Sequence, residues 1–168
     1  MHWYEWMTLA IIVTVTIIQT VRGIKAGGMG LPLFEAIGVV VAAVASTSFS
    51  PGLAGEIHVR ESTVMLALFI ALAVVAFMVA RWLFTVTTFS SQSLDGFFSC
   101  MFGLVMAWTM AHMFLRIMIS SQGLDGEIAT NMATLSVVRE VFEFRTWNAL
   151  MRLLFRAKLS PDMNPDVG

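Results

Sequence analysis

The chain has 168 residues, of which 58% are hydrophobic and 12% are charged, and its mean hydropathy is +0.82. Soluble domains carry about 25% charged residues, so this composition excludes a protein whose whole surface faces water. The formal net charge of −1 gives no indication of nucleic-acid binding, and we predict no nucleic-acid partner. We therefore predict an all-α fold, an integral membrane four-helix bundle at 1–124 followed by a C-terminal amphipathic helix.

The first predicted span covers about residues 3–21 and opens with aromatic side chains. Trp3, Tyr4 and Trp6 suit the headgroup level of a bilayer. Because no basic region precedes the apolar run and no small-residue cleavage site follows it, we expect a retained helix rather than a signal peptide. The glycine-rich sequence at 22–30, RGIKAGGMG, is expected to form a tight reversal into the next helix.

The second predicted span, at about 31–49, carries a face of small side chains at a spacing of four. These residues are Gly38, Ala42 and Ser46. In lipid, small residues let helix backbones approach closely, which favours packing. The SPG sequence that begins at Ser50 is expected to end this helix and to open a polar loop that runs to residue 62.

The third and fourth predicted spans cover about 63–84 and 94–119. The third carries one charge, Arg81, near its far end, where a long side chain can reach the interface. The fourth has its own face of small residues. They are Ser99, Gly103, Ala107 and Ala111. We expect this face to pack against the small-residue face of the second span.

Two similar heptapeptides flank the fourth span, SSQSLDG at 90–96 and SSQGLDG at 120–126. Each is typical of a polar turn that leads into a helix, with Ser or Asp available as a cap. The repeat is therefore interpreted as capping chemistry rather than as a duplicated unit.

The segment at 125–159 mixes charges into a helical pattern of apolar residues. The apolar positions are Val137, Val141, Phe144, Trp147, Met151, Leu154 and Phe155. This pattern predicts an amphipathic helix that lies on the bilayer or covers the end of the bundle. Residues 160–168 are expected to form a flexible tail.

Four spans place both termini on one side of the membrane and bring five charged residues together near the other side. They are Arg22, Lys25, Glu35, Arg81 and Asp95. Charge in a membrane is costly, so this cluster either gates a route for an ion or locks helix ends together; we favour the lock. Short-loop charges place this side in the cytoplasm of a bacterial inner membrane and the termini in the periplasm.

Histidine and methionine offer weaker candidates for a site. His2, His58 and His112 fall toward the terminal side, and although imidazole can ligate a metal or haem, we favour ordinary interfacial residues. Met101, Met106, Met110, Met113 and Met118 crowd the fourth span, and we favour apolar filling over a protein-facing or pigment-facing surface. Cys100 is the single cysteine, which excludes an internal disulfide. We predict no enzyme activity and no cofactor.

Four short segments resemble the CvpA family, the colicin V production proteins. They are RGIKAG at 22–27, LFEAIG at 33–38, LDG at 94–96 followed by FGL at 102–104, and SVVREVF at 136–142. The chain departs from the family at Trp6-Met7, where the family has an aspartate, at Gly96, where it has an arginine, and at Ala107, where it has a further glycine. The resemblance implies a small inner-membrane protein tied to toxin production and envelope homeostasis, with no catalytic residues to carry over.

A different class of function is an accessory subunit. Such a protein would pack its Met- and Trp-rich helices into a larger respiratory, photosynthetic or secretory complex. The expected partners are thus the lipid bilayer and either further copies of the chain or other membrane proteins. A channel built by oligomers is disfavoured, because the spans have no acidic or basic residue at mid-membrane.

Overall fold

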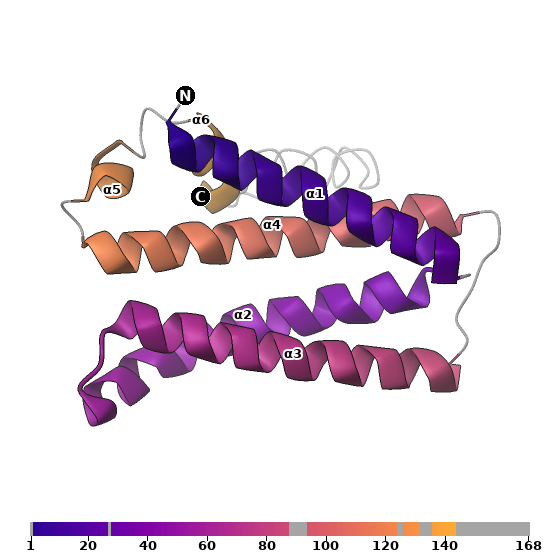
Figure 1. Ribbon diagram of the computed structural model, residues 1–168, viewed down its shortest axis with the longest axis horizontal. Coiled ribbons are helices and arrows are strands. Elements are labelled where there is room, and N and C mark those ends of the chain that lie inside the picture. The colour runs from indigo at the N-terminus through magenta and orange to yellow at the C-terminus, as the bar shows by residue number, and fades with distance from the viewer. Residues whose placement is uncertain (1, 27, 88–93, 124–125, 132–135, 144–168) are drawn as a thin grey trace, which may run out of the picture.

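The computed structural model describes residues 2–26, 28–87, 94–123, 126–131 and 136–143, and this part of the chain is built from α-helices (Figure 1). In chain order they are α1 (Trp3–Ala26), α2 (Gly30–Ile57), α3 (Glu61–Thr87), α4 (Asp95–Gln122), α5 (Glu127–Asn131) and α6 (Ser136–Glu143). The predicted all-α fold is confirmed.

The first four helices are long and apolar enough to cross a membrane. They contain 24, 28, 27 and 28 residues. At ~1.5 Å per residue these helices are about 36 to 42 Å long, which exceeds the ~30 Å hydrocarbon core. The chain is therefore a multi-pass membrane protein.

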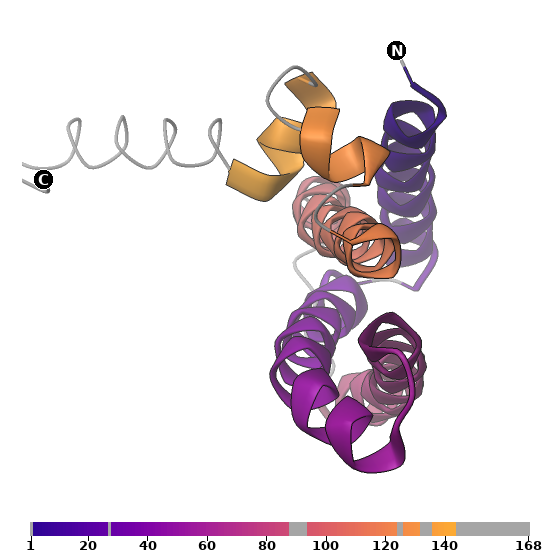
Figure 2. The ribbon, with the colours of Figure 1, turned by 90° about the vertical axis from the view of Figure 1, so that its left-hand side faces the viewer.

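The four long helices form two antiparallel pairs. α1 packs along α4 and α2 packs along α3, while contact between α2 and α4 joins the pairs (Figures 1 and 2). One apolar core lies between α2, α3 and α4 around Met65, Met106 and Met113. A second core surrounds Tyr4 and Leu115 at the end where α1 begins and α4 ends.

The turn between α1 and α2 is shorter than the sequence predicts. Residues 22–26 continue α1, and α2 begins at Gly30. Gly23 is therefore helical. Its lack of a side chain allows α1 to approach α4, because an added Cβ would overlap Ser99 of α4. The glycine serves close helix packing here rather than a reversal of the chain.

The predicted end of the second helix at Ser50 is wrong. Pro51 lies inside α2, which continues to Ile57 and ends at His58 with a left-handed φ of 54°. A proline removes one helical hydrogen bond, but the following turn keeps its backbone bonds and still buries Ala54. The connection to α3 is consequently much shorter than the predicted loop at 50–62.

The C-terminal segment covers the bundle in its described part. α5 and α6 lie beside the bundle near α1 and α4 (Figure 2). Ile128 of α5 and Val138 and Val141 of α6 are buried in one cluster with Tyr4 and Leu115. Val138, rather than the predicted Val137, is the residue that pairs with Val141 on the buried face. The rest of the predicted amphipathic helix, at 144–159, and the tail at 160–168 lie outside the described residues, as do most of the first heptapeptide and the middle of the second.

Candidate functional site, a buried polar junction

The most unusual polar contact in the apolar bundle joins α1 to α2. Arg22 donates from both terminal nitrogens to Glu35, at 2.9 Å to Oε2 and 2.7 Å to Oε1. Glu35 has no exposed surface, whereas about a third of the Arg22 side chain (34%) stays accessible. A charge buried this completely is tolerated only when it is paired and hydrogen-bonded, and the two-point contact meets that requirement.

Gln19 extends the ion pair toward α4. Its amide nitrogen donates to Glu35 Oε2 at 2.7 Å and lies 3.0 Å from the sulfur of Met106. Gln19 lies one helical turn before Arg22, so both side chains approach Glu35 from the same face of α1. The sequence analysis did not identify Gln19 as a site residue, although its spacing of three from Arg22 can be read from the sequence.

The start of α4 meets the connection between α1 and α2. Asp95, which is buried, accepts a hydrogen bond from the backbone N–H of Met29 at 3.1 Å. One turn into α4, the hydroxyl of Ser99 is fully buried opposite Gly23. We call the five residues Gln19, Arg22, Glu35, Asp95 and Ser99 the polar junction.

The predicted charge cluster divides into two parts. Arg22, Glu35 and Asp95 belong to the polar junction, where Arg22 and Glu35 form the lock between helix ends. Lys25 and Arg81 are exposed at the same end of the bundle, and neither forms an ion pair within the described ranges.

The small residues pack differently from the arrangement that the sequence predicts. Gly103 of α4 faces α1, since an added Cβ would lie 2.9 Å from Gln19 Cβ and 3.2 Å from the carbonyl oxygen of Thr16. Gly38 of α2 faces α3, where an added Cβ would lie 2.7 Å from that of Ala76. Gly103 thus allows close packing within the α1–α4 pair and Gly38 within the α2–α3 pair, and neither glycine joins α2 to α4.

The remaining small residues are all buried, and one of them supports the contact between the pairs. They are Ala42, Ser46, Ala107 and Ala111. Ala42 belongs to the core cluster that contains Met106 and Met113 of α4. In this shared core the methionines of α4 fill the irregular space that small side chains such as Ala42 leave.

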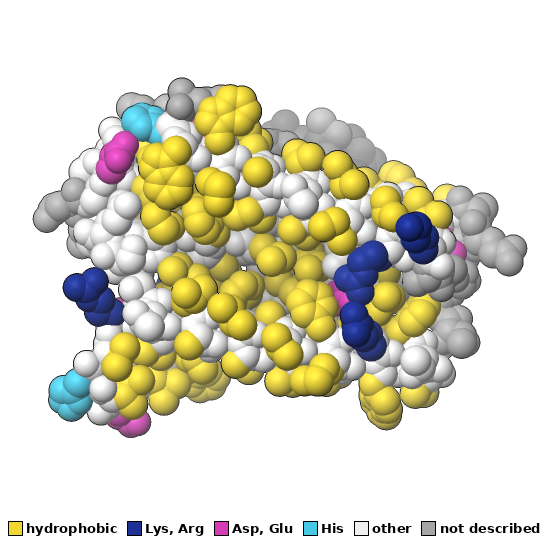
Figure 3. Space-filling model, viewed as in Figure 1, with side chains coloured by type: hydrophobic (Ala, Val, Ile, Leu, Met, Phe, Trp, Pro, Cys, Tyr) yellow, Lys and Arg dark blue, Asp and Glu magenta, His cyan; other side chains and the backbone are white. Residues whose placement is uncertain are grey.

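An apolar groove lies between the two helix pairs, in the half of the bundle where α1 and α3 begin and α4 ends. It lies between α1 and α3 with α4 as its floor, and it has a volume of about 610 Å³. Its walls include Val15 of α1, Phe69 and Ile70 of α3 and Met113 and Phe114 of α4. Figure 3 shows this hollow among hydrophobic side chains on the face that carries both α1 and α3.

The histidines do not converge. His2 lies 3.1 Å from Glu127 through Nδ1, His58 is exposed at the end of α2, and His112 packs its ring 4.7 Å from that of Phe142. Within the described ranges, no group of three or more His, Cys, Asp or Glu residues could hold a metal ion.

The methionines of α4 serve more than one surface. Met106 and Met113 are buried in the core, whereas Met101 is exposed. Met110 and Met118 line the groove. Core filling thus accounts for only part of this group.

Three segments that are far apart in the sequence, at 22–27, 33–38 and 94–96, contribute residues to the polar junction. Arg22 belongs to RGIKAG, Glu35 to LFEAIG and Asp95 to LDG, and the hydrogen bonds above connect each segment to another or to the turn between them. Comparisons with protein families, curated proteins and solved structures find no match to the chain.

Proposed function

We propose that the chain is a non-catalytic protein of the bacterial inner membrane that acts in envelope homeostasis, transport or export, as the resemblance to the CvpA family implies. The observation that supports this proposal is the polar junction. Segments far apart in the sequence, each carrying part of the resemblance, contribute the Arg22–Glu35 pair and Asp95, which binds the Met29 N–H in the turn between α1 and α2.

The junction is better suited to specifying a helix arrangement than to chemistry. A buried ion pair contributes little net stability, because desolvation offsets the attraction, but it penalises every arrangement that separates the partners. Arg22 and Glu35 thereby define the pairing of α1 with α2 at one end of the bundle. Toward the other end, where α1 and α3 begin, these two helices are separated by the apolar groove, which opens sideways toward the membrane.

Complementation tests this function directly. The chain is expressed in a bacterium that lacks its own colicin V production protein, and colicin V in the medium is measured. We expect the wild type to restore export and Arg22→Ala to fail, while Gly52→Ala, a substitution into open space on α2, restores it. Immunoblots of the membrane fraction show whether each variant is present. A wild-type protein that inserts but restores nothing contradicts the proposal.

Purification from the native membrane in mild detergent distinguishes the accessory-subunit alternative. A homo-oligomer without other proteins agrees with an autonomous envelope protein. A stoichiometric complex with other membrane proteins would replace the proposal with a structural role in that complex.

A further inference from the structure

We propose that the cleft between α1 and α3 binds an anionic phospholipid, with its phosphate at Arg22, Lys25 and Arg81 and an acyl chain in the apolar groove. These three cations are called the basic rim. The inference does not depend on the proposed function, since it rests on the basic rim, on the groove and on the predicted orientation of this end.

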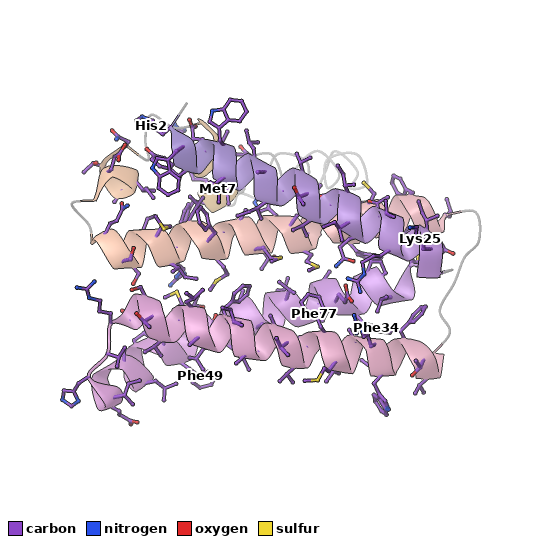
Figure 4. All side chains as sticks on the ribbon, in the orientation of Figure 1. His2, Met7, Lys25, Phe34, Phe49 and Phe77 are labelled. Atoms are coloured by element: carbon purple, nitrogen blue, oxygen red, sulfur yellow. The ribbon has the colours of Figure 1, made fainter. Side chains whose placement is uncertain are left out.

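The basic rim lies at one end of the bundle. Arg22 and Lys25 occupy the last turns of α1, and Arg81 lies near the end of α3, which reaches the same end of the molecule. Figure 3 shows Lys and Arg side chains gathered over this part of the face, and Figure 4 labels Lys25 at the end of α1. Their common location presents positive charge to one leaflet.

The rim carries unneutralised charge at headgroup depth. Glu35 neutralises Arg22, but Lys25 and Arg81 form no ion pair within the described residues. Trp82, next to Arg81, has an exposed fraction of 64%. Exposed tryptophan is typical of the membrane interface, so the neighbouring cations lie where lipid phosphates lie.

The groove lies at the depth that an acyl chain from this leaflet reaches. The groove residues nearest the rim, Val15 and Ile70, lie about 10 Å from Arg22 along α1 and about 16 Å from Arg81 along α3, and the groove continues away from the rim to Met7 and Leu66. One leaflet of hydrocarbon is about 15 Å thick. A lipid with its phosphate at the rim would therefore extend a chain into the groove near mid-membrane.

The combination of rim and groove favours a phospholipid over other occupants. A free phosphate ion would use the cations but not the groove, and a neutral lipid would use the groove but not the cations. Basic pockets between membrane helices on the cytoplasmic side are known to bind anionic headgroups, and the short-loop charges assign this end to that side.

Native mass spectrometry of the purified protein tests the site. The wild type is incubated in mixed micelles of phosphatidylglycerol and phosphatidylethanolamine, and bound lipid is counted. We expect retention of phosphatidylglycerol, and about a fivefold loss of affinity for each cation removed in Lys25→Gln and Arg81→Gln. Arg60→Gln, which removes an exposed cation at the opposite end, is the matched control and should change nothing.

A second variant tests the acyl-chain part of the site. Thr14 is exposed and lines the groove, so Thr14→Phe should obstruct it and weaken phosphatidylglycerol binding with the rim intact. Equal retention of the two lipids, no effect of the rim variants, or no effect of Thr14→Phe would each overturn the proposal. Displacement of the lipid by millimolar inorganic phosphate would overturn it too, by identifying a simple phosphate site.

Discussion

Arg22 and Glu35 form a two-point ion pair in which the acid is fully buried and the base is about one third (34%) exposed. This difference in exposure makes the two partners unequal. Arg22 can turn toward the headgroups if its partner is lost, because its long side chain already reaches the surface. Glu35 is fully buried, and among the described residues Arg22 and Gln19 donate the side-chain hydrogen bonds to its carboxylate.

Removing the Arg22 side chain should therefore lower the free energy of unfolding more than neutralising Glu35. We expect Arg22→Ala to lower the free energy of unfolding by about 3 kcal/mol, since it leaves a buried carboxylate without its cation. Glu35→Gln keeps the shape and one acceptor oxygen, so about 1 kcal/mol is expected. Thermal unfolding in detergent measures both. Equal losses would contradict the asymmetry.

Replacing both partners by apolar residues should recover stability. The double variant Arg22→Met, Glu35→Leu removes the desolvation cost together with the attraction, and such replacements are often neutral. We expect it to unfold at a higher temperature than Arg22→Ala. A double variant as unstable as the single one would mean that the ion pair contributes strongly to net stability.

Gly23 should resist even the smallest side chain. Gly23→Ala places a methyl group against Ser99, and overpacking of this kind costs about 1 to 3 kcal/mol. Gly52→Ala is the matched control, because it meets nothing within 4 Å and should be neutral or slightly stabilising in a helix. Adding Ser99→Gly to Gly23→Ala should restore the unfolding temperature if the clash is the cause.

Gly38 makes the same test possible in the other helix pair. Gly38→Ala brings its Cβ within 2.7 Å of the Ala76 Cβ, so we expect a lower unfolding temperature. The compensating change is Ala76→Gly, and Gly55→Ala is the control in open space on the same helix. If Gly38→Ala unfolds at the wild-type temperature, the close approach of α2 and α3 at this point is contradicted.

The C-terminal cover should depend on Val138 more than on Val137. Val138 is fully buried, and its truncation to alanine removes apolar contact worth about 2 kcal/mol. Val137 is only partly buried, so Val137→Ala serves as the matched control. We expect limited proteolysis to cleave near α6 faster in Val138→Ala. Equal cleavage rates would show that α6 is held by other contacts.

Cysteine labelling checks the predicted orientation. In a Cys100→Ser background, Arg60→Cys on the α2–α3 connection should react with an impermeant maleimide in intact cells whose outer membrane admits the reagent. Lys25→Cys at the end of α1 should react only after the inner membrane is opened, because the short-loop charges place it in the cytoplasm. The reverse pattern would invert the topology.

The membrane helices could be predicted from the sequence because hydropathy over one helix length is a local property. The ends of these helices were harder to predict from the sequence. Pro51 and the glycines at 22–30 are helix-breaking signals in isolation, yet packing and continued backbone hydrogen bonds extend α1 to Ala26 and α2 to Ile57. The charge cluster could be anticipated from topology, which places helix ends together, but Gln19 was missed because an amide in a membrane helix is compatible with many environments.

By itself, the sequence determined that four apolar helices cross a membrane and that their charges gather near the ends. Only the tertiary structure decided which helices these small residues contact. Gly23 of α1 packs against α4, Gly103 of α4 packs against α1, and Gly38 of α2 packs against Ala76 of α3. The physical reason is that small residues permit close approach to any helix without selecting one. The choice of partner depends on the combined fit of all faces, on the Arg22–Glu35 pair and on the groove left between α1 and α3.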